Sequence, residues 1–100
     1  MLMHVRVTVP TEAGNEAIRT GTLGRVIETF AEAAHPQCMV FGAEEGKRTM
    51  YTVFDLEDAA DLPRLFEPMF MELGAELHHV PVMDGEQLKR GLSAALEAVA

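Results

Sequence analysis

The sequence predicts an α+β domain in which strands and helices follow the order βαββαβ, with one further helix at the end. Near the start of the chain, apolar and polar residues alternate with the period of a strand whose two faces meet different environments. The middle of the chain holds two strand-like segments joined by a short, charged, glycine-bearing loop, and helix-period segments separate this pair from the outer strands. This order is typical of the ferredoxin-like fold, a four-stranded antiparallel sheet with both long helices on one face.

The first strand covers residues 2–9, where every odd residue is apolar. We expect its odd valines to pack under the helices and Leu2, His4, Arg6 and Thr8 to point toward the opposite, open face.

Three further strands are expected at residues 37–43, 48–55 and 75–83, and the hairpin loop between the middle two at residues 43–47. Pro81 removes a backbone donor, which indicates an edge strand or a strand end at this position.

The first helix is expected to start between Glu12 and Thr22 and to end at Ala34, because Pro36 cannot continue a helix and restricts His35 before it. Its apolar stripe consists of Leu23, Val26, Ile27, Phe30 and Ala34. Early glycines weaken the first part and favour a late start. Arg19 falls on the same stripe if the helix is continuous, so it is either a pocket residue or a sign of that late start.

The second helix is expected to begin at Asp58 or Asp61, with Leu62, Leu65 and Phe66 facing inward. Pro63 is tolerated near the helix start, whereas Pro68 predicts an irregular end or a kink before residues 69–71.

A final helix is expected over residues 84–99. Asp84 and Gln87 have the spacing of a capping box, and the apolar stripe comprises Leu88, Leu92, Ala95, Leu96 and Val99.

The length of 100 residues predicts one domain, residues 1–100, with a core over residues 1–83 and a terminal helix over residues 84–99. No apolar run is long enough to cross a membrane, and no basic segment precedes an apolar one, so we expect a cytoplasmic protein without a membrane partner.

The net charge is −8 and the basic residues are scattered, which argues against nucleic acid as a partner. Cys38 is the only cysteine, and its apolar neighbours predict a buried, inert thiol.

The open face of such a sheet exposes more apolar area than a monomer usually does. A homodimer or a higher homo-oligomer that closes two such faces would enclose a cavity for a small, mainly apolar organic molecule. The candidate ligand-binding residues are Leu2, His4, Arg6, Thr8, Tyr51 and His78. His78 and His79 point to opposite faces of a strand, and no cluster of histidine and carboxylate is present, so we expect neither a metal site nor a cofactor.

Two blocks of the sequence resemble those of muconolactone isomerases. These blocks are the opening segment, with Met1, Leu2, His4, Val5, Arg6, Thr8 and Val9, and the later segment Tyr51-Thr52-Val53-Phe54-Asp55. The resemblance implies a dimeric α/β barrel and a cofactor-free isomerase that moves a proton next to a carbonyl. Residues 30–36 and the helix after Met83 differ from that family, and the pattern is also similar to small single-domain proteins of the same superfamily that have no established activity.

Three hypotheses follow. The first is a dimeric α/β barrel that binds a small organic molecule, with no reaction specified. In the second, an isomerase, His4 or His78 is general base and acid, and Arg6 or Tyr51 stabilises the developing enolate oxygen. The third is a structural or oligomerisation module in which the terminal stripe is an exchanged or docking helix.

Overall fold

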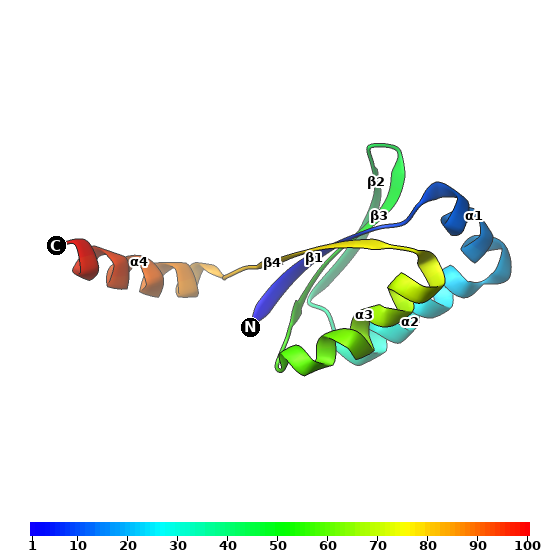
Figure 1. The fold of residues 1–100 in the computed structure, drawn as a ribbon. Helices are drawn as coiled ribbons and strands as arrows, with labels where there is room; N and C mark the ends of the chain where they lie inside the picture. The colour runs from blue at the N-terminus through cyan, green and yellow to red at the C-terminus, as the bar shows by residue number, and fades with distance from the viewer.

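The computed structural model describes residues 1–100 and confirms the ferredoxin-like order with an additional C-terminal helix (Figure 1). The strands are β1 (Leu2–Thr8), β2 (Cys38–Glu44), β3 (Lys47–Asp55) and β4 (Glu76–Pro81). The helices are α1 (Thr11–Thr20), α2 (Thr22–Ala34), α3 (Leu62–Leu73) and α4 (Gly85–Val99), and a 3-10 turn, η1 (Ala59–Asp61), precedes α3. All strand pairs are antiparallel, in the order β2-β3-β1-β4, so β4 is an edge strand that ends at Pro81, as its sequence predicts.

The core lies between one face of the sheet and the helices α2 and α3, which contact each other over that face (Figure 1). The odd residues of β1 are buried there while the even residues stay half-buried on the other face, so the alternation of the first strand is confirmed. Phe54 from β3 lies between Phe30 of α2 and Phe66 of α3, with ring centroids 5.7 and 5.9 Å away. This aromatic cluster joins the sheet to both helices.

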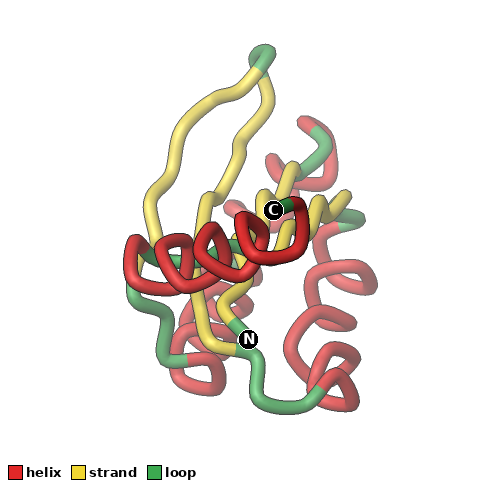
Figure 2. The backbone as a smooth tube through the Cα atoms, turned by 90° about the vertical axis from the view of Figure 1, so that its left-hand side faces the viewer, coloured by secondary structure: helices red, strands yellow, loops and turns green.

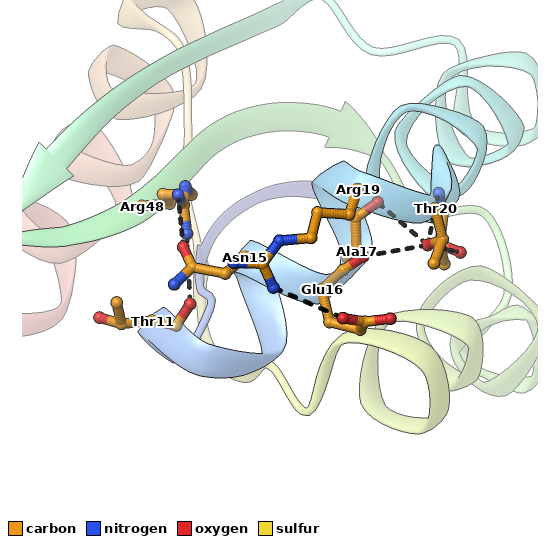
Figure 3. Close-up of polar contacts among 8 residues, drawn as sticks. Thr11, Asn15, Glu16, Ala17, Arg19, Thr20 and Arg48 are labelled. Carbon is orange, nitrogen blue, oxygen red and sulfur yellow. Dashed lines mark hydrogen bonds and ion pairs between the residues drawn. The ribbon is translucent and has the colours of Figure 1, made fainter.

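The first helical segment is two helices, because the chain turns at Gly21. Gly21 has φ of 79°, a left-handed conformation that glycine adopts without steric cost, and it ends α1 and starts α2. The main stripe therefore begins at Thr22, the late start that the glycines favour. Arg19 is exposed and lies 3.6 Å from Glu16 within α1, so it is not a pocket residue (Figure 3).

Arg48 of β3 fixes α1 against the end of the sheet. Its guanidinium donates to the Asn15 side chain at 2.9 Å and to the Thr11 carbonyl at 3.4 Å (Figure 3). Gly14 allows this close approach, since a Cβ there would lie 2.7 Å from the Arg48 guanidinium.

The helix α3 continues through Pro68 to Leu73, so of the two expected outcomes, an irregular end or a kink before residues 69–71, the irregular end is wrong. Proline removes one backbone donor, but the residues that follow it, Met69 and Leu73, are each 1% exposed in the core. We attribute the continuous helix to this burial, which opposes the local cost of the proline.

The β2–β3 hairpin is tighter than its sequence indicates. Its turn is formed by Glu45 and Gly46 alone, with φ of 52° and 78°, as in a two-residue type I′ turn. Glu44, expected in the loop, is therefore the last residue of β2.

The helix α4 stands clear of the rest of the molecule. It has the capping box between Asp84 and Gln87 that its sequence predicts, and none of its residues is buried or half-buried. It extends beyond the end of β4 in Figure 1 and is the helix nearest the viewer in Figure 2. Neither this helix nor any other has the length and apolar character needed to cross a membrane.

Candidate functional site

The candidate site lies on the open face of the sheet, opposite the helices. The strand register places Arg6 of β1 between Tyr51 of β3 and His78 of β4, and it places His4 between Val53 and Val80. Because residues paired across a sheet point to the same face, these six side chains share one surface.

An ion pair and a hydrogen bond meet on this face at Glu44. The Arg6 guanidinium donates to one carboxylate oxygen of Glu44, and the Tyr51 hydroxyl donates to the other at 2.8 Å. The Arg6 and Glu44 side chains keep about a third of their surface exposed, 34% and 37%. The three residues, from three strands, form a network that covers the middle of the open face toward β2.

The network sets the protonation states of its two acidic groups. The hydrogen bond from Tyr51 lowers the pKa of Glu44, against partial burial, and the charges of Arg6 and His78 lower it further. The hydrogen bond to Glu44 raises the pKa of Tyr51, and burial raises it too. At neutral pH, Glu44 is therefore a carboxylate and Tyr51 a neutral hydroxyl whose proton faces that carboxylate.

The histidines flank this network. The ring centroid of His4 lies 6.4 Å from that of Tyr51. His78 is opposite Arg6 on the open face, as the sequence favours, whereas His79 faces the helices and packs its ring edge to face with Phe66 at 5.3 Å. The open face thus carries two imidazoles, one guanidinium, one phenol and one carboxylate.

Apolar side chains surround these polar groups. Leu2, Val40, Val53 and Val80 lie on the same face, and Val40 and Val80 are 54% and 52% exposed. Cys38 is paired with Val53 on this face and is exposed, so the expectation that it is buried is wrong. The reason is that β2 is an edge strand, and its even residues point to the side that no helix covers.

Glu44 is a residue of the candidate site that the sequence did not indicate. Its position in a charged loop suggested a solvated turn residue. The two-residue turn at Glu45-Gly46 extends β2 by one residue and gives Glu44 the same facing as Val40. The recognised indications of such a turn are Asn-Gly and Asp-Gly, and the Glu45-Gly46 pair shares only the glycine with them, so the signal for this register in the sequence is weak.

The open face of the chain holds no enclosed cavity. The largest cavity, about 330 Å³, lies near the end of β3, between α2 and α3, and contains none of the six candidate ligand-binding residues. No three histidine, cysteine, aspartate or glutamate side chains come together in an arrangement that would hold a metal ion.

Comparisons of the chain with protein-family models, with curated proteins and with solved structures give no match.

Proposed function

We propose that this protein is a homodimer that binds a small, mainly apolar organic molecule between two facing sheets. The observation that carries this proposal is the open face itself, where an Arg6–Glu44–Tyr51 network and two histidines are surrounded by exposed valines. A sheet face of this kind ordinarily packs against another layer. A second copy would supply that layer and enclose the polar groups, which are otherwise open to solvent.

The charge balance of the site favours a ligand that is uncharged or carries one polar group. The positive charge of Arg6 is already neutralised by Glu44, so it does not select for a strongly anionic ligand. The remaining donors of Arg6 and the imidazoles of His4 and His78 are suited to a carbonyl or hydroxyl oxygen, while the valines and Leu2 contact the apolar part.

Dimerisation and ligand binding are tested together with Val40→Glu, which places a charge on the open face. We expect the wild-type protein to sediment as a dimer and to bind a neutral naphthylamine dye saturably, and the variant to be monomeric with dye binding lost. Ile18→Glu is the matched control, because Ile18 is 51% exposed on α1, away from the open face, and its substitution should change neither property. A wild-type monomer that binds no dye would contradict the proposal.

A second candidate function is a cofactor-free isomerase that moves a proton next to a carbonyl. The observation that favours it is the placement of His4 and His78 on the same face as Tyr51 and Arg6. The two imidazoles are groups that can transfer a proton, and the phenol and the guanidinium can donate hydrogen bonds to an enolate oxygen.

A proton NMR time course of muconolactone with catalytic protein tests the isomerase. Turnover by the wild type that falls at least about a hundredfold in His4→Ala or His78→Ala would support it, since a general acid or base contributes about 10²–10⁴-fold. His79→Ala is the control, because His79 faces the helices. Absence of turnover by the wild type would reject this substrate and leave the binding function as the proposal.

A further inference from the structure

The terminal helix α4 has an apolar stripe with no partner in its own chain. Leu88, Leu92, Leu96 and Val99 recur on one side of the helix, and each is about half exposed or more. A 15-residue helix without tertiary contacts is only marginally stable in water, and Gly91 near its middle weakens it further. The helix nevertheless begins with a complete capping box, which indicates that the sequence is suited to form it. We therefore expect another surface to pack against the apolar stripe and stabilise the helix.

An open apolar groove lies between the helix layer and the edge strand β2. It has a volume of about 200 Å³ and apolar walls from Val9, Leu23, Ile27, Phe41 and Met50. Phe41 is 58% exposed at its rim, which is unusual for a large aromatic side chain. A second open apolar groove on the helix side, beside β4 and lined by Phe66 and Phe70, is smaller at about 180 Å³, so we take the α2–β2 groove as the surface that the α4 stripe fits.

The α4 helix is poorly placed to reach this groove in its own chain. It leaves from β4, the opposite edge of the sheet, and Val82 is bonded to Leu2 at the far end of β1 from Val9. The distance along β1 from Leu2 to Val9 is about 23 Å, and the linker of residues 82–84 spans at most about 11 Å. Figure 1 shows the same separation, with α4 on one side of the molecule and the β2–β3 hairpin and α1 on the other. The start of α4 therefore lies far from this groove and the helix points away from it, which favours an occupant from another molecule.

The surface area that a stable dimer has to bury also favours the packing of α4 on a second copy of the chain. The open faces of two four-stranded sheets, each about 19 by 23 Å, bury roughly 900 Å² in total when they meet, below the ~1,200 Å² of a stable dimer. A helix about 22 Å long and about 10 Å wide adds roughly 200 Å² to each of the two surfaces it joins, and two arms bring the total to the usual ~1,600 Å² or slightly more.

From these observations, we infer that α4 is an exchanged arm, whose leucine stripe packs into the α2–β2 groove of a second copy of the chain. The inference rests on the proposed dimer and adds to it the element that holds the two copies together. In a two-fold dimer each copy gives one arm and receives one, so both grooves and both stripes are covered.

Disulfide trapping between different chains tests the arm. In a Cys38→Ser background, full-length Leu92→Cys is mixed with full-length Phe41→Cys and oxidised mildly, and the products are separated without reductant. We expect a covalent pair that contains one chain of each variant, and the same result with Leu96→Cys in place of Leu92→Cys. Leu92→Cys mixed with Ile18→Cys is the control and should give no mixed pair. All these positions are exposed, so the substitutions should leave the fold of each chain intact.

Three results would overturn the inference. A cross-link within one chain that carries both Leu92→Cys and Phe41→Cys would show that α4 folds back on its own body. An efficient pair of two Leu92→Cys chains alone would show that two α4 helices pack on each other. Absence of any mixed pair would show that α4 does not occupy the groove. Mass and dye binding of the same samples separate the two proposals: a dye-binding dimer without the mixed pair contradicts only the arm, whereas a monomer that binds no dye contradicts the proposed function as well.

Discussion

The two faces of one sheet differ in what covers them. Neighbouring residues of β3 show this directly: Phe54 is fully buried in an aromatic cluster with α2 and α3, whereas Val53 is half-buried on a face without helices. The centre of the covered face is apolar apart from Thr52, whose hydroxyl donates to the Cys38 carbonyl at 2.9 Å, and the open face combines valines with an ion-pair network. The comparison teaches that the chain completes one side of its sheet by itself and leaves the other side without a covering layer of its own.

The largest expected effect is a difference in the free energy of unfolding between two variants, each of which shortens one side chain on one face of the sheet. Phe54→Ala removes a ring from a packed core and should lower the free energy of unfolding by about 3–5 kcal/mol, a large part of the ~5–15 kcal/mol of a typical domain. Val53→Ala should cost much less in a monomer, because its site is half open. Denaturant unfolding of both variants measures the difference.

The same pair of variants also sharpens the proposal of a dimer. If the open face is covered by a second copy, the cost of Val53→Ala should grow with protein concentration, while the cost of Phe54→Ala relative to wild type should not. Equal and concentration-independent costs for the two variants would contradict the contrast between the faces.

An intermediate effect is expected on the titration of Tyr51, the single tyrosine of a chain without tryptophan. Because Glu44 raises the pKa of Tyr51, tyrosinate absorbance should appear above the usual pKa of about 10. The hydrogen bond therefore stabilises the fold below that usual value, and this stabilisation is lost as pH rises through the raised pKa. At the acidic end, the lowered pKa of Glu44 acts in the other direction: its stabilisation is present above the usual glutamate range and is lost as pH falls through the lowered value.

Glu44→Gln tests the cause of that shift. The midpoint of the tyrosinate titration should move back toward the usual value, since the variant keeps an acceptor but loses the charge. Glu45→Gln changes the adjacent glutamate, which is exposed in the turn, and should leave the midpoint where it is in the wild type. A midpoint that is insensitive to Glu44→Gln would show that the network does not persist in solution.

The smallest effect is expected from an ion pair on the helix side. Arg25 of α2 donates to Glu72 of α3 at 2.7 Å, and this contact raises the pKa of Arg25. Both side chains are well exposed, so salt and solvent screen the pair, and Arg25→Gln should leave the unfolding midpoint unchanged. Arg6→Gln, which breaks the corresponding pair on the open face, should weaken dye binding. A large, salt-sensitive loss of stability in Arg25→Gln would contradict this distinction.

The sequence by itself determined the features that depend on neighbours along the chain. The alternation of β1 fixed which of its residues are buried, Pro36 and the left-handed His35 ended α2 at Ala34, and Asp84 with Gln87 started α4. Each of these follows from local backbone geometry or from the period of one element, so the βαββαβ order of elements along the chain and the facing of His4 and Arg6 were predictable.

Only the tertiary structure decided the features that depend on register and packing between distant segments. A turn one residue tighter or looser reverses the facing of a strand, which is why the Glu44 carboxylate and the exposed Cys38 were not foreseen. Burial of Met69 and Leu73 carried α3 past Pro68 against its local preference. The straight continuation of β4 beyond Val82, bonded to Leu2, placed α4 away from its own body, and a long-range contact of this kind has no counterpart in the local sequence.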